Sequence, residues 1–99
     1  MSENKPDKEF WDRADEVIHL ANNQCDTASI GKVSSSLLYA AARFNSFIVA
    51  SSAKSAEELK SDKEKAVEYF VEQYKKMLVE NIDEHINNYE KNIEDQRNS

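Results

Sequence analysis

SSSLLYAAARFNSFIVASSA, residues 34–53, is the stretch that decides the fold. It is apolar on nearly all sides, whereas the rest of the chain is amphipathic. Between residues 37 and 50 the polar side chains are Arg43, Asn45 and Ser46. A helix that is apolar on nearly all sides must be covered on several sides. The apolar part of the stretch, residues 37–50, is shorter than the roughly 20 apolar residues of a membrane span, and it carries a charge in its middle. We therefore predict a central helix with at least two neighbouring helices and no membrane role.

The composition favours a single domain made of a few long helices. The 99 residues include one Gly and one Pro, which is too few for an all-β chain rich in turns. The formal net charge of −6 argues against binding to nucleic acid or to an anionic membrane surface. The single Cys25 cannot form an internal disulfide, and residues 1–9 are too polar for a signal peptide. We therefore expect a cytoplasmic protein.

Periodicity and caps divide the chain into three helices. The first is expected over residues 7–23, with one apolar face. That face consists of Phe10, Trp11, Ala14, Val17, Ile18 and Ala21. The second is expected over residues 29–54, and the acceptable N-caps near its start are Asp26, Thr27 and Ser29. Its residues Ala42, Ser46 and Ala50 form a line of small side chains.

The third helix is expected over residues 55–94, and two capping boxes compete for its start. Ser55 is followed by Glu58, and Ser61 by Glu64, at the spacing that lets side chains and backbone N–H groups satisfy each other. Both remain possible from the sequence, and a long helix from Ser55 is favoured.

An apolar stripe runs along this third helix at intervals of 4, 3, 4, 4, 3, 4 and 4 residues. Its average period of about 3.67 is close to that of an unstrained helix, so an ordinary heptad coiled coil is not predicted. Larger apolar neighbours widen the stripe in its first half, which is therefore expected to face a full core. The stripe consists of Val67, Val71, Tyr74, Leu78, Ile82, His85, Tyr89 and Ile93.

These elements predict an all-α fold, a three-helix up-down-up bundle with a long C-terminal helix. Residues 1–99 form one domain, in which residues 1–5 and 95–99 are expected to fray. The third helix is longer than the other two, so its end should overhang them and expose apolar side chains that suit self-association. The residues expected to take part are Ile82, His85, Ile86, Tyr89 and Ile93.

Three runs of this sequence resemble a family of small bacterial helical proteins known as domain of unknown function 3144. The runs are EFWDRADEVIHLAN, SSSLLYAAARFNSFIVASSA and DKEKAVEYFVEQYKKMLVENIDEHI. The resemblance extends from about Phe10 to Tyr89. It implies a compact bacterial helical domain, and it brings no activity, cofactor, partner or functional residue.

The residues provide no set suited to catalysis or to metal binding. Glu16 and His19 have the Glu-x-x-His spacing of carboxylate metal sites, but a second such motif is missing and both should face water. Cys25 lacks an evident base and orienting group. A single Gly cannot build a phosphate-binding loop. We therefore expect no enzyme, no cofactor and no metal.

One polar cluster remains a candidate contact site. A buried Arg43 would need a carboxylate or carbonyl partner, and it could form a pocket with its neighbours. The residues of this candidate site are Trp11, Tyr39, Arg43 and Asn45. Two hypotheses follow. The first is a non-enzymatic helical interaction module that self-associates or binds a protein, and the alternative is a small-ligand-binding or regulatory domain with a pocket near Trp11, Tyr39 and Arg43.

Overall fold

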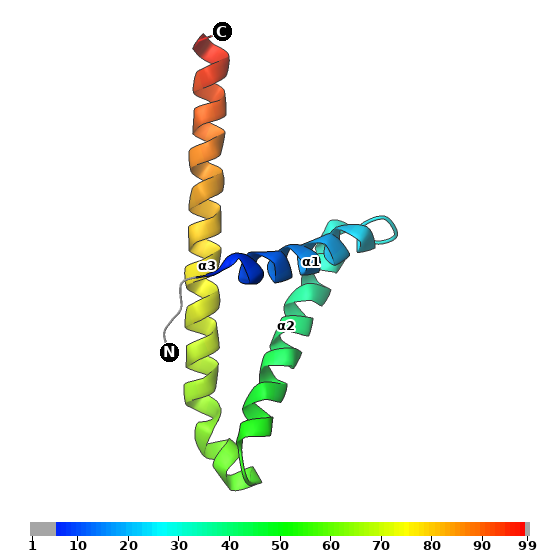
Figure 1. Cartoon of the computed structure of the whole chain (residues 1–99), viewed down its shortest axis with the longest axis vertical. Coiled ribbons are helices and arrows are strands. Elements are labelled where there is room, and N and C mark those ends of the chain that lie inside the picture. Colours follow the sequence, from blue (N-terminus) through cyan, green and yellow to red (C-terminus); the bar gives the residue numbers. More distant parts are fainter. Residues whose placement is uncertain (1–5, 99) are drawn as a thin grey trace. The chain divides into compact units, whose positions relative to one another are not determined.

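The described residues form three α-helices, which Figure 1 shows in blue (α1), cyan to green (α2) and green to red (α3). A computed structural model describes the backbone of residues 6–98 and the side chains of residues 6–91. The helices are α1 (Lys8–Gln24), α2 (Ile30–Ser52) and α3 (Ala56–Asn98), of 17, 23 and 43 residues. The described residues contain no strand, so the predicted all-α class with three helices and a long last helix is confirmed.

The contacts within the chain define two compact units. The first comprises Met1–Ile48, which includes α1 and most of α2, and the second comprises Val49–Ser99, which includes the last turn of α2 and all of α3. The frayed end expected at residues 1–5 lies outside the described residues. Residues 95–98, also expected to fray, continue α3, because the chain has no Gly or Pro beyond Gly31 to end that helix.

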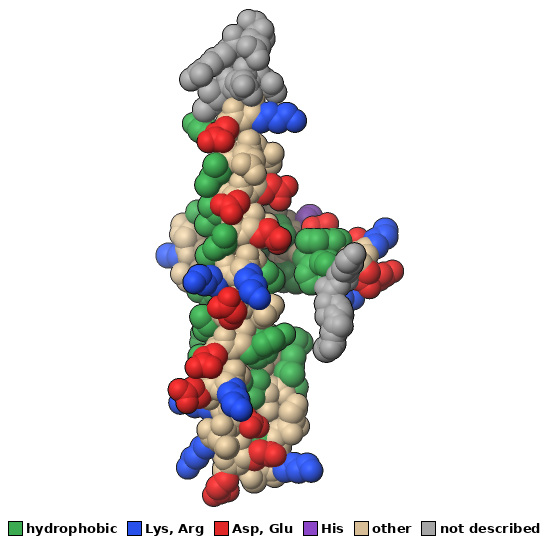
Figure 2. All heavy atoms as spheres, turned by 90° about the vertical axis from the view of Figure 1, so that its left-hand side faces the viewer, with side chains coloured by type: hydrophobic (Ala, Val, Ile, Leu, Met, Phe, Trp, Pro, Cys, Tyr) green, Lys and Arg blue, Asp and Glu red, His purple; other side chains and the backbone are tan. Residues whose placement is uncertain are grey.

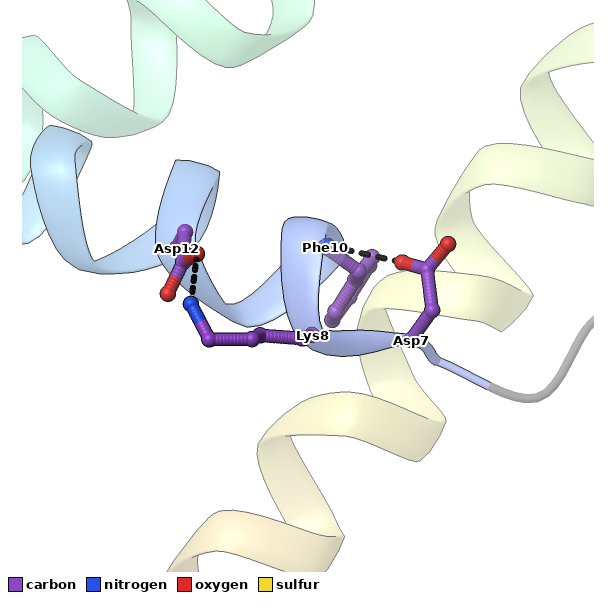
Figure 3. A network of polar contacts seen from close by, with 4 residues as sticks. All are labelled: Asp7, Lys8, Phe10 and Asp12. Carbon is purple, nitrogen blue, oxygen red and sulfur yellow. Dashed lines mark hydrogen bonds and ion pairs between the residues drawn. The ribbon is translucent and has the colours of Figure 1, made fainter.

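Helix α1 begins at a side-chain cap. The carboxylate of Asp7 accepts a hydrogen bond of 2.8 Å from the backbone N–H of Phe10, as Figure 3 shows. Lys8 and Asp12, one turn apart, form an exposed ion pair of 2.8 Å. At the other end, the backbone N–H of Cys25 donates to the carbonyl of Asn22 and closes the last turn. Local chemistry therefore accounts for both ends of the helix.

Helix α2 uses Ser29 as its cap, which settles the choice left open by the sequence. The Ser29 hydroxyl accepts from the backbone N–H of Lys32 at 3.3 Å, and its carbonyl accepts from that of Val33 at 3.0 Å. The helix ends at Ser52, two residues before the expected end. Gly31 lies in the first turn with a negative φ, so this position does not need the freedom of glycine.

The core of the first unit is small and lies where the 25–29 connection brings the end of α1 back beside the start of α2. Val33 is buried, with 9 % of its surface exposed. The half-buried residues of α1 and of the connection are small, and they are Ala14, Ala21, Cys25 and Ala28. The expectation that residues 34–53 are covered on several sides is wrong within this unit. The side chains of Phe44, Phe47 and Ile48 are exposed, because the 17 residues of α1 cover only the beginning of α2.

Helix α3 begins at Ala56, so the first of the two capping boxes is used. The Ser55 hydroxyl accepts from the backbone N–H of Glu58 at 3.1 Å. The Glu58 carboxylate accepts from the backbone N–H of Lys54, one residue before the serine. The sequence pattern places this bond on Ser55 itself. Ser61 lies inside α3. With 43 residues, the helix is about 64 Å long.

Candidate functional site

The candidate site is an apolar stripe on one face of α3 that the structure leaves uncovered. We call it the α3 stripe. Its six members lie three or four residues apart, which places them along one side of the helix. Each side chain keeps 43–68 % of its surface exposed. Figure 2 shows hydrophobic side chains along the length of α3 beside rows of charged ones. The members are Val71, Tyr74, Leu78, Ile82, Ile86 and Tyr89.

A different row of α3 side chains is half-buried. This row follows the spacing i, i+7, i+11 and i+14, and it consists of Leu59, Ala66, Phe70 and Gln73. The Phe70 ring also meets the ring of Tyr69 edge to face, with their centroids 5.2 Å apart. The expectation that the first half of the stripe faces a full core concerns packing against the first unit, and it stays a prediction. At this end of the helix the less exposed face is that of Ala66 and Phe70, while Val67 and Val71 remain exposed.

The residues expected from the sequence to take part in self-association lie on or beside the α3 stripe. Ile82, Ile86 and Tyr89 belong to it, and His85 is exposed between them. Ile93 lies on α3, and its side chain is outside the described residues. Sequence reasoning missed Val71, Tyr74 and Leu78 as contact residues, because it assigned the first half of the stripe to the core. Their spacing continues that of the later residues, and this was the signal available.

Polar side chains border the α3 stripe, and His85 lies among its members. Asn81 donates from its amide nitrogen to the carbonyl of Met77 at 2.7 Å, so part of its polarity is satisfied within α3. On the other side, an open hollow is lined mainly by charged side chains, and they are Glu72, Lys75, Lys76, Val79, Glu80 and Asp83. A face of this kind, an apolar strip with a polar border, is suited to binding another helix.

The second candidate cluster does not form around a buried arginine. Trp11, Tyr39 and Arg43 are all exposed, and Asn45 is half-buried. The sequence left open whether Arg43 is buried or reaches the edge of its helix, and on α2 its side chain is exposed. Its backbone carbonyl accepts a 2.8 Å hydrogen bond from the Ser46 hydroxyl, a local contact within the helix. Trp11 stacks edge to face on its neighbour Phe10, with 4.9 Å between ring centroids.

The side chains able to ligate a metal remain apart in the described part of the chain. Among those residues, no three His, Cys, Asp or Glu side chains come together in a group that could hold a metal ion. Glu16 and His19 are both exposed on α1. Cys25 is a half-buried free thiol at the end of that helix. The same residues include no helix with the length and apolar character needed to cross a membrane.

Three helices with no strand in the described residues, and with an uncovered apolar face on the longest helix, define a small all-α protein. The chain belongs to a known family of such proteins. The profile of the family described as "Protein of unknown function (DUF3144)" matches residues 10–86, which is most of the chain. The resemblance noted from the three sequence runs is thus confirmed.

A solved structure supports the fold. The chain is similar to the protein NB7890A from Shewanella sp, whose structure was determined by NMR, with 33 % sequence identity and a TM-score of 0.74. The similarity covers 90 % of this chain and 93 % of that one. No curated protein matches the chain.

Proposed function

We propose that this chain is a non-enzymatic helical interaction module that self-associates or binds a protein partner through the α3 stripe. One observation carries the proposal: six apolar side chains share one face of α3 and keep about half of their surface in water. Contiguous exposed apolar surface is a marker of protein–protein contact. Covering each such side chain with another helix removes apolar area from water, at about 25 cal/mol per Å².

This face can make apolar contacts with a partner. Its members are aliphatic or phenolic, and the acidic and basic groups beside them are exposed. A second hypothesis, a small-ligand pocket near Trp11, Tyr39 and Arg43, has less support because all three side chains are exposed. With Cys25 as its single cysteine, we place the module in a reducing compartment, the cytoplasm.

A photo-crosslinking amino acid introduced into the full chain in its native host tests this proposal. It replaces Ile82, a member of the α3 stripe, or Asn87, an exposed residue on the opposite side of the same helix. We expect position 82 to cross-link to a second copy or to one protein partner, and position 87 to give much less product. Adding Ile86→Lys should abolish the product at position 82.

Two results would contradict the proposal. One is a cross-link at position 82 that forms only within the same chain, because the α3 stripe would then be covered without a partner. The other is equal labelling from positions 82 and 87, because contact would then be independent of the apolar face.

A further inference from the structure

The α3 stripe has a symmetric spacing. From Val71 to Tyr89 its members follow one another at intervals of 3, 4, 4, 4 and 3 residues. The pattern therefore reads the same in both directions about residue 80. The eighteen residues that separate the two ends correspond to five turns of an unstrained helix and to about 27 Å, so the stripe runs straight along α3.

This symmetry has a consequence for pairing with an identical helix. In a two-fold interface each contact occurs twice with the partners exchanged. Two copies of α3 that run antiparallel about residue 80 would place each apolar residue opposite another one. Val71 would face Tyr89 of the second copy, Tyr74 would face Ile86, and Leu78 would face Ile82. A register shifted by one or two residues would lose this match.

The charges beside the stripe distinguish antiparallel from parallel pairing. Residues 71–79 contain one acidic residue, Glu72, and two lysines, Lys75 and Lys76, which gives a net charge of +1. Residues 81–89 contain Asp83 and Glu84 and no lysine or arginine, which gives −2 with neutral histidine. Antiparallel pairing sets the positive half against the negative half, whereas parallel pairing sets like charges together. Such exposed charges contribute little affinity but determine orientation.

The face used for this pairing is free of the other contacts of α3. The half-buried row that includes Leu59, Ala66 and Phe70 lies to one side of the helix, whereas every stripe member remains exposed. A second copy that docks on the α3 stripe therefore contacts a different side of α3 from the one that carries Leu59, Ala66 and Phe70.

We propose that α3 pairs with α3 of a second copy in antiparallel orientation, with the two-fold axis near residue 80. This inference rests on the proposed function and adds the partner, the direction and the register. In this dimer the α3 stripes of the two copies cover each other, and Lys75 of each copy lies on the same flank of the interface as Asp83 of the other.

Cysteine cross-linking tests the register. In a Cys25→Ser background, chains with Val71→Cys and chains with Tyr89→Cys are mixed and treated with a short bis-maleimide linker. We expect a cross-link between the two kinds of chain and none between two Val71→Cys chains, because their cysteines lie about 27 Å apart along the axis. Asn87→Cys, away from the stripe, serves as the control and should give little product with either chain.

A second measurement uses the unaltered sequence, in case the variants associate poorly. Isotope-labelled and unlabelled chains are mixed and coupled with a zero-length carbodiimide. We expect mixed-isotope peptides that join Lys75 to Asp83. Efficient coupling of Val71→Cys to itself would overturn the antiparallel register while leaving self-association intact. Absence of any product between chains, together with a monomeric mass, would overturn this inference, whereas the binding of another protein is tested separately by the photo-cross-link at position 82.

Discussion

At the scale of single residues, the helix ends are set by short-range hydrogen bonds. Asp7, Ser29 and Ser55 each accept from a backbone N–H three residues later, and the three bonds measure 2.8–3.3 Å. A cap of this kind stabilises a helix by about 1 kcal/mol. These contacts need no tertiary neighbour, so they can form in a chain that has little buried core.

Gly31 offers a simple test of the description of α2. Its φ is negative, and a Cβ added there would meet no atom within 4 Å. Gly31→Ala should therefore raise the free energy of unfolding by about 0.5–1 kcal/mol, because alanine loses less backbone entropy on folding. Urea unfolding followed by circular dichroism measures the change. A decrease in stability would show that the first turn of α2 differs from this description.

Arg43 should be dispensable for folding. Because its side chain is exposed, Arg43→Met is expected to change the free energy of unfolding by less than about 0.5 kcal/mol. Val33→Ala is the matched control, since it removes apolar volume from the buried position and should cost about 1–3 kcal/mol. If Arg43→Met were as damaging as Val33→Ala, the arginine would have a structural partner.

At the scale of the elements, the two capping boxes provide a matched pair of variants that tests where α3 begins. Ser55 caps α3, whereas Ser61 lies within it at an exposed position. Ser55→Ala should cost about 1 kcal/mol of stability, while Ser61→Ala should be neutral or slightly stabilising, because alanine is the better helix former. Urea unfolding of both variants compares them. The reverse order would move the start of α3 to Ser61.

The sequence predicted the positions of the helices better than it predicted which face of each helix is covered. Helix boundaries follow from local signals such as Ser29, Ser55 and the scarcity of Gly and Pro, and these signals are readable along the chain. The face of a helix that becomes covered depends on which segments meet it. Phe70 and Val71 are neighbours in sequence and both apolar, yet Phe70 is half-buried and Val71 is exposed. No local pattern distinguishes them.

The same limit applies to the candidate sites. Exposed apolar side chains at Ile82, Ile86 and Tyr89 could be anticipated, because α3 was expected to be longer than its neighbours. The sequence left open whether Arg43 is buried with a partner or reaches the edge of its helix, because apolar neighbours in the sequence do not determine whether a helix face is covered. The structure leaves the side chain exposed. A long charged side chain can also extend past apolar neighbours into water.

At the scale of the whole molecule, most large apolar side chains of the described region are exposed, and one side chain is buried. A 99-residue chain can bury only a modest core on its own, and pairing with another copy adds burial. The α3 stripe supplies a continuous face for this, with a spacing and charge distribution that fit its own antiparallel copy. Self-association is therefore the central claim.

The molar mass of the full chain in solution tests that claim most directly. Light scattering after size exclusion should give about twice the 11.4 kDa of one chain. Ile82→Lys, which places a charge in the stripe, should weaken the dimer at least about tenfold and bring the mass toward 11.4 kDa. Asn87→Lys adds the same charge on the other side of α3 and should leave the dimer intact. A mass of 11.4 kDa for the unaltered chain at every concentration would contradict the account.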